Sequence, residues 1–220
     1  MPDSTTVADC YAIAERYQLR ERLPQSVRSI VEARNLVETP KAGDPAFARS
    51  QYLTVLANAT AVRAAVERAA LAGFAVDLDN SCDDWDFRPA ADYLLERLRR
   101  LRKGVSRACL ISGGEVTVKV GAEAGAGGRN QHFALYCAQK IAGESITVLS
   151  AGTDGIDGNS PAAGAIADGS TLERAKQQGF EAATSLANFD SYSLFHAIGD
   201  AIVTGPTGNN VRDLRILLAY

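Results

Sequence analysis

Two acidic residues, Asp154 and Asp157, lie three residues apart in the segment 151–158, which has a glycine at every third position. This segment follows an apolar stretch at 146–150, and its loop can direct both carboxylates at a divalent cation or a substrate hydroxyl. A pair of Asx-type turns would use the same residues. Because two acids recur among three glycines at the end of a predicted strand, we interpret the segment as functional.

A second segment, 125–131, combines glycines with Arg129, Asn130 and Gln131 and opens an apolar helical stretch. The free backbone N–H groups of a helix amino terminus and an arginine side chain together form an anion site. The alternative is a flexible loop with a surface arginine. We favour the anion site.

Two more glycine-containing segments lie at predicted strand ends. Residues 112–115 place Glu115 directly after an apolar strand, although for the two glycines alone we favour a tight hairpin turn with a solvated glutamate. Residues 204–210 include Thr207 and Asn210, and their backbone could form a nest for a phosphate or a simple Gly-Pro turn. The four segments together predict a site with anion donors and a few carboxylates, which is what phosphoryl transfer requires.

Other common sites are not indicated by the sequence. No GxGxxG opens the first predicted helix, and no GxxxxGK[ST] occurs, so neither a Rossmann dinucleotide site nor a Walker-type phosphate loop is expected. The two histidines belong to no recognisable serine–histidine–acid set, and His196 follows Phe195 in an apolar helix, where we expect a packed core residue.

Composition narrows the class of protein further. The formal net charge of -3 gives no reason to expect nucleic acid as a partner. The four cysteines form no CxxC pair, which fits a reducing compartment. Since neither a signal peptide nor an apolar membrane span can be read, we expect a cytoplasmic protein that is not embedded in a membrane.

The elements that position these residues have the pattern of an α/β domain. Apolar strands alternate with amphipathic helices, which predicts a mostly parallel sheet with helices on both faces. The expected strands are 52–57, 74–78, 108–112, 146–150 and 214–219. Period-two alternation at 115–120 also predicts a β-hairpin after Gly114.

The beginning of the chain has a different pattern. Thr6 and Asp9 match a helix capping box, and a second short helix follows Pro24. Prolines and a glycine at 39–45 indicate a linker. We therefore expect a helical segment and linker at 1–47, followed by the α/β domain at 48–220.

The glycine-rich segments, taken in order, resemble the glycerate 2-kinase family, whose terminal portion is called the MOFRL domain. The resemblance covers about 108–220 and rests on residues 111–115, 127–131, 151–158, 188–192 and 204–208. It implies conversion of glycerate to 2-phosphoglycerate with ATP and Mg²⁺, in a cleft between two α/β domains. Some members of the family are labelled hydroxypyruvate reductases.

The resemblance also implies roles for individual residues. Arg129 would stabilise charge on the transferred phosphoryl group, and Asp154 would bind the metal or the substrate hydroxyl. The residues implied to bind substrate or phosphate are Glu115, Asn130, Asp157, Thr207 and Asn210. The sequence departs from the family pattern at Val116, His132 and Asn209.

The family's amino-terminal domain, which supplies a catalytic lysine, is not matched in this chain. Residues 1–47 then correspond to a remnant of that domain, and we expect the chain alone to be inactive. A hydroxypyruvate reductase and a ligand-binding remnant without catalysis stay open as alternatives, as does a homodimer.

Overall fold

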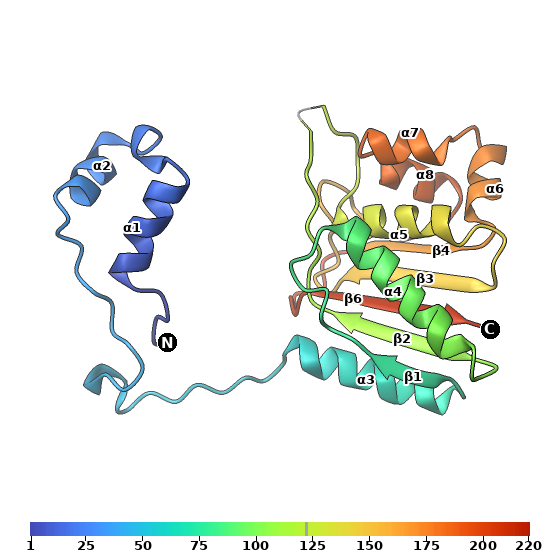
Figure 1. Ribbon diagram of the computed structural model, residues 1–220, viewed down its shortest axis with the longest axis horizontal. Helices are drawn as coiled ribbons and strands as arrows, with labels where there is room; N and C mark the ends of the chain where they lie inside the picture. Colours follow the sequence, from blue (N-terminus) through green and yellow to red (C-terminus); the bar gives the residue numbers. More distant parts are fainter. Residues whose placement is uncertain (122) are drawn as a thin grey trace. The chain divides into compact units, whose positions relative to one another are not determined.

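The computed structural model describes residues 1–121 and 123–220 of the chain. These residues form two compact units, Met1–Val55 and Leu56–Tyr220 (Figure 1).

The amino-terminal unit consists of short helices joined by turns. It contains α1 (Val7–Arg16), α2 (Gln25–Glu32) and two single 3₁₀ turns, Leu19–Glu21 and Pro45–Phe47. The capping box expected at the start of α1 is confirmed, because Asp9 N donates to Thr6 Oγ1 and Thr6 N donates to Asp9 Oδ2. None of the residues of α1 and α2 is buried, so this unit has no hydrophobic core of its own.

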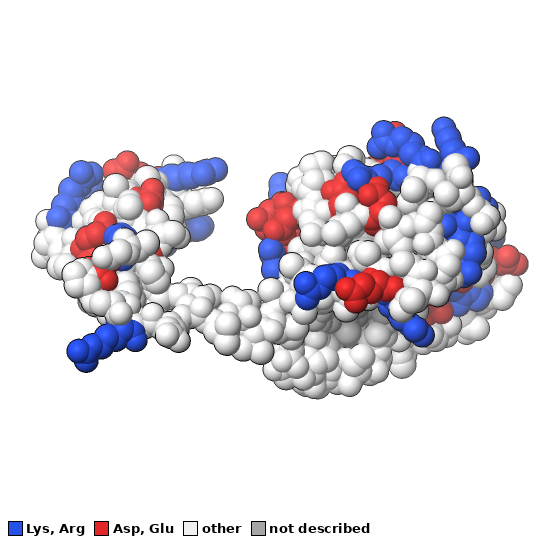
Figure 2. Space-filling view, turned by 90° about the horizontal axis from the view of Figure 1, so that it is seen from below, with Lys and Arg blue, Asp and Glu red and all other residues white. Residues whose placement is uncertain are grey.

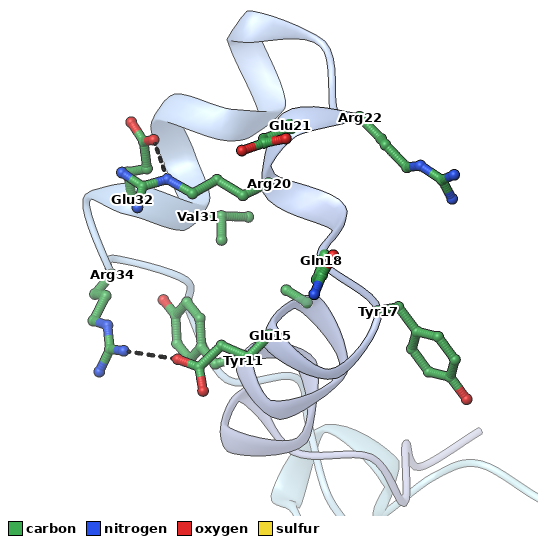
Figure 3. Close-up of a pocket in the computed structure, with 11 residues that line it drawn as sticks. Tyr11, Glu15, Tyr17, Gln18, Arg20, Glu21, Arg22, Val31, Glu32 and Arg34 are labelled. Carbon is green, nitrogen blue, oxygen red and sulfur yellow. Dashed lines mark hydrogen bonds and ion pairs between the residues drawn. The ribbon is translucent and has the colours of Figure 1, made fainter.

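A groove of about 840 Å³ separates α1 from α2 (Figure 3). Two ion pairs span it, Arg34 to Glu15 at 3.4 Å and Arg20 to Glu32 at 2.8 Å. Exposed pairs of this kind stabilise a fold by about 0–1 kcal/mol each. The groove therefore does not replace the missing core.

The second unit is an α/β domain with one six-stranded sheet, in the order β1-β2-β6-β3-β4-β5. The strands are β1 (Ala75–Leu78), β2 (Ala108–Gly113), β3 (Ile146–Gly152), β4 (Gly164–Asp168), β5 (Ala201–Ile202) and β6 (Asp213–Ala219). Among the strands of the described residues, β1 and β2 pair in parallel and all other neighbours are antiparallel.

The prediction of a mostly parallel sheet was therefore wrong. The crossover from β2 to β3 does run through a helix, as expected, but the two strands are not neighbours. The last strand of the chain, β6, lies between them and runs antiparallel to both. A non-helical connection between β3 and β4 adds another antiparallel pair.

Helices cover both faces of the sheet, as predicted (Figure 1). On one face lie α4 (Phe87–Arg102), α5 (Arg129–Lys140), α6 (Thr171–Gln177), α7 (Ala182–Ala187) and α8 (Ser191–Ala197). The other face is covered by α3 (Asn58–Leu71). Successive residues of β2 point to opposite faces of the sheet. Leu110 belongs to the core under α4 and α5, while Cys109 and Ile111 pack with Val62 of α3.

Three local predictions were also wrong. Residues 52–57 form no strand, since they find no partner in the sheet, and Tyr52, Leu53 and Val55 are exposed. The hairpin expected at 115–120 is absent because this stretch pairs with the loop before α4, where Thr117 N donates to Trp85 O. His196 is exposed, although its neighbours Leu194 and Phe195 are buried.

Two further features concern the charges on the surface and the length of the helices. On the face of the α/β unit seen in Figure 2, acidic and basic side chains are interspersed. Among the described residues, no helix combines the length and apolar character that crossing a bilayer requires.

Candidate functional site

The predicted site residues lie on loops at one edge of the sheet. The loops after β2 and β3 and the loop before β6 meet there, because β6 runs opposite to its two neighbours (Figure 1). Helix α5 begins at the same edge with Arg129. The antiparallel insertion of β6 therefore brings the segments 112–115, 125–131, 151–158 and 204–210 together.

The carboxylate of Asp157 caps the first turn of α5. Its Oδ1 accepts hydrogen bonds from Asn130 N (3.1 Å) and Nδ2 (3.3 Å), and its Oδ2 accepts from Gln131 N (2.9 Å) and Nε2 (3.0 Å). Burial raises the pKa of Asp157, whereas these donors act in the opposite direction. A negative charge at this position also complements the positive end of the helix dipole.

Asn130 belongs to the same internal network. Its side chain is buried, and its Oδ1 accepts a hydrogen bond of 2.7 Å from Ser150 Oγ on β3. The polar atoms of Asn130 and Asp157 are thus paired inside the protein. These hydrogen bonds connect the start of α5 to β3 and to the 151–158 loop.

Close backbone approach explains the glycines before α5. A Cβ atom on Gly128 would lie 2.4 Å from Asp157 Oδ1 and 2.5 Å from its backbone carbonyl carbon. Any other residue at this position would therefore move the carboxylate that caps the helix. Gly127 is also confined, since its φ of 143° is in the region that favours glycine.

Arg129 is bound by two carboxylates. Its Nε donates to Asp213 Oδ2 at 2.7 Å and its Nη2 to Asp213 Oδ1 at 3.0 Å, while Glu115 Oε1 lies 3.1 Å from Nη2. The hydrogen bonds to Asp213 and the charges of both acids hold the pKa of Arg129 above its usual range. The guanidinium is half-buried, permanently charged and held in one orientation.

The loops at 153–155 and 204–210 interlock around Asp154. Thr207 N donates to Asp154 O at 2.9 Å, and Asn210 Nδ2 lies 3.4 Å from Asp154 Oδ2. Gly155 has a φ of 89°, and an added Cβ would come within 2.0 Å of Gly205 O. Thr207 and Asn210 therefore position Asp154, whose side chain stays partly accessible.

A pocket of about 520 Å³ opens at this edge and is lined by Arg129, Asp154 and Asp157 together with Gly125, Gly127, Gly128 and Phe189. Of the other predicted site residues, Glu115 contacts Arg129, and Thr207 and Asn210 contact Asp154. Asn130 hydrogen-bonds to Ser150 and Asp157. His132 is a packing residue, since it is buried and stacks on Phe189 at 4.0 Å between ring centres.

The described residues include no cluster of three or more acidic, histidine or cysteine side chains that could hold a metal ion. Asp157 and Asp213 are buried and Glu115 pairs with Arg129, whereas the side chain of Asp154 stays partly accessible, although its oxygens accept hydrogen bonds from Ile156 N and Asn210 Nδ2. Mg²⁺ is commonly held by one or two protein carboxylates together with substrate phosphates. The site therefore fits a magnesium ion that is carried by a phosphate ligand, and it does not provide a cage for the metal alone.

Sequence reasoning missed Asp213, Arg212 and Arg215. Asp213 is buried at the start of β6, where an acid precedes an apolar strand, and that position was the only sequence signal for it. Arg212 donates to both oxygens of Asp83, at 2.8 and 2.6 Å. Arg215 is fully buried, and its Nη2 donates to Gly113 O and Gly114 O at 3.3 and 3.1 Å.

The fold and these contacts define an α/β domain with an arginine-centred pocket at one edge of its sheet. Residues 108–213 of the chain match the MOFRL family. The resemblance seen in the sequence is thereby confirmed.

Relatives are found over almost the whole chain. The D-glycerate 2-kinase of Thermotoga maritima is 35% identical over 98% of this chain and 50% of its own length. A protein from Agrobacterium vitis that carries the name hydroxypyruvate reductase is 38% identical over 98% of this chain and 49% of its own length. The chain therefore spans about half the length of the curated relatives it matches.

Two solved structures have a similar fold to this chain. The crystal structure of the Thermotoga maritima glycerate kinase superposes with a TM-score of 0.76 and 33% identity, covering 100% of this chain and 51% of that one. A protein from Pyrococcus horikoshii superposes with a TM-score of 0.73 at 29% identity.

Proposed function

We propose that this chain is the phosphate-handling half of a glycerate 2-kinase, which transfers a phosphoryl group from ATP to the 2-hydroxyl of glycerate. The observation that supports this proposal most strongly is the position of Arg129. It lies at the amino terminus of α5 and lines the 520 Å³ pocket together with the partly accessible Asp154. A fixed arginine and a helix amino terminus both favour the charge that develops on a transferred phosphoryl group.

In the proposed reaction the 2-hydroxyl oxygen bonds to the γ-phosphorus, the bond from that phosphorus to the bridging oxygen of ADP breaks, and the hydroxyl proton is released. Arg129 contacts the phosphoryl oxygens in this proposal. Asp154 either binds Mg²⁺ or accepts the hydroxyl proton, and the contacts from Thr207 and Asn210 hold it for that purpose. Mg²⁺ would supply neutralising charge between the phosphates.

The domain assignment is part of the same proposal. Residues 1–47 would belong to a first domain, and 48–220 would form the second. The relatives are about twice as long as this chain, and the part of them that the chain does not match would supply the partner for catalysis.

Two other functions compete with a kinase. A hydroxypyruvate reductase would consume NADH in the presence of hydroxypyruvate, and we expect no enzyme-proportional loss of NADH absorbance. A binding remnant would retain nucleotide affinity without turnover even when the amino-terminal domain is supplied.

The test is the affinity for Mg·ATP measured by calorimetry on the wild-type chain and on Arg129→Ala. We expect Arg129→Ala to weaken binding by about tenfold, equivalent to about 1.4 kcal/mol. Arg174→Ala is the matched control, because Arg174 is similarly exposed and also binds two carboxylates, Asp168 and Asp200, but does not line the pocket. Equal loss of affinity in both variants would refute the proposed phosphate site.

A further inference from the structure

The two carboxylates on Arg129 differ in burial and in geometry. The Asp213 side chain is 1% exposed and binds the guanidinium through two hydrogen bonds, whereas the Glu115 side chain is 32% exposed and approaches one nitrogen. We propose that Asp213 is a fixed positioning residue and that Glu115 is an exchangeable counter-ion, whose place on Arg129 is taken by a phosphoryl group of the substrate. This inference rests on the proposed function of the site.

Asp213 has little freedom to leave Arg129. It is the first residue of β6, pairs with Gly152 of β3, and its carbonyl oxygen accepts a hydrogen bond of 3.1 Å from Asn58 Nδ2. Its carboxylate occupies the edge of the guanidinium formed by Nε and Nη2. Since a buried charge that loses its partner is strongly destabilising, this pair is expected to persist when ligand binds.

Asp213 leaves one edge of Arg129 for a ligand. Nη1 makes no hydrogen bond to any described residue, and Glu115 Oε1 lies 3.1 Å from Nη2 as an ion pair without a hydrogen bond to it. Once Glu115 moves away, Nη1 and Nη2 together present the paired donors that suit two phosphoryl oxygens.

Glu115 has a second position available. Its Oε1 lies 3.9 Å from Arg212 Nε, so a small rotation of the side chain exchanges Arg129 for Arg212 as its partner. The backbone before it stays fixed, because buried Arg215 holds the carbonyl oxygens of Gly113 and Gly114. The structure therefore allows the Glu115 side chain to move without rearrangement of the loop.

A pair of substitutions separates this proposal from simple charge neutralisation. Glu115→Gln and Asp213→Asn each remove one negative charge beside Arg129. If both acids only neutralise the arginine, both variants bind an anion more tightly. If Asp213 orients the guanidinium and Glu115 competes with the ligand, the two variants shift the affinity in opposite directions.

The experiment titrates inorganic pyrophosphate into the full chain and measures the dissociation constant by calorimetry. We expect Glu115→Gln to bind about 3- to 10-fold more tightly and Asp213→Asn about tenfold more weakly, with each tenfold corresponding to about 1.4 kcal/mol. Asp213→Glu keeps the charge but displaces the carboxylate by one methylene, and it should also weaken binding. Tighter binding by both charge-removing variants, or no change in Glu115→Gln, would overturn the proposal.

A second readout needs no ligand. In ¹⁵N spectra of the arginine side chains, the Nε–H signal of Arg129, assigned through its loss in Arg129→Lys, should exchange slowly with water. We expect Glu115→Gln to preserve this protection and Asp213→Asn to abolish it, and the reverse pattern would refute the two roles. If the wild-type chain binds no pyrophosphate, the proposed function fails, while this spectrum still decides which carboxylate holds Arg129.

Discussion

Replacing Gly128 by alanine should destabilise the α/β unit through steric contact with one residue, Asp157. The added Cβ would lie 2.4 Å from Asp157 Oδ1, and the side chain of Asp157 accepts four hydrogen bonds from the first turn of α5. Hydrogen bonds to a charged group contribute about 1.5–3 kcal/mol each, so the loss of one or two costs roughly 3 kcal/mol. For a unit of this size that corresponds to a fall in Tm of about 6–12 °C.

The assay is urea unfolding followed by circular dichroism, with a thermal melt on the same samples. Gly104→Ala is the matched control, because an added Cβ there meets no atom within 4 Å and neither glycine has a left-handed backbone. The control should change stability by less than about 0.5 kcal/mol. Equal unfolding midpoints for the two variants would show that Asp157 does not hold the helix as argued.

Three further outcomes are expected. Burial lowers the pKa of His132 from 6.5 to about 4, so only the unfolded chain takes up this proton between those values, and stability should fall as pH drops from 6.5 to 4. His132→Gln should flatten that dependence in urea titrations at several pH values, and an unchanged slope would contradict it. In a two-domain form of the enzyme, Arg129→Ala should lower kcat by about 100-fold or more with a smaller change in KM, which steady-state kinetics can check. The chain alone should melt sharply yet show no glycerate-dependent ADP release near about 1–100 per second in a coupled assay.

Sequence reasoning succeeded where the signal is local. The capping box at Thr6 and Asp9 and the glycine-rich start of α5 both follow from a few neighbouring residues. Strands β2, β3 and β6 also lie where apolar runs predicted them. These features depend on backbone capping and on side-chain periodicity, and both can be recognised from residues that are close together in the sequence.

Non-local pairing was not predictable in the same way. Nothing within residues 213–219 specifies that this strand enters between β2 and β3, because its neighbours are distant in the chain. Residues 52–57 show the converse, since their apolar and β-branched composition favours a strand but no partner strand is present. Strand formation depends on the partner as much as on the segment itself.

Some residues of the site could be predicted from the sequence and others could not, because some of their contacts join distant parts of the chain. Arg129 could be identified from its place at a helix amino terminus, but Asp213, which orients it, is 84 residues away. The spacing of the acids at 154 and 157 does not distinguish them, and their environments in the structure differ. Asp157 is buried against the backbone of α5, while the side chain of Asp154 stays partly accessible at the pocket.

The glycines at the site follow from contacts rather than from a need for flexibility. Besides Gly128 and Gly155, an added Cβ on Gly158 would lie 2.1 Å from Gly127 O. Each of these contacts joins a loop to another loop or to the start of α5, so the glycines allow several backbones to pack closely at one edge of the sheet. Close packing of this kind restricts the motion of Arg129 and Asp154, and phosphoryl transfer depends on charges that are already in position when the substrate arrives.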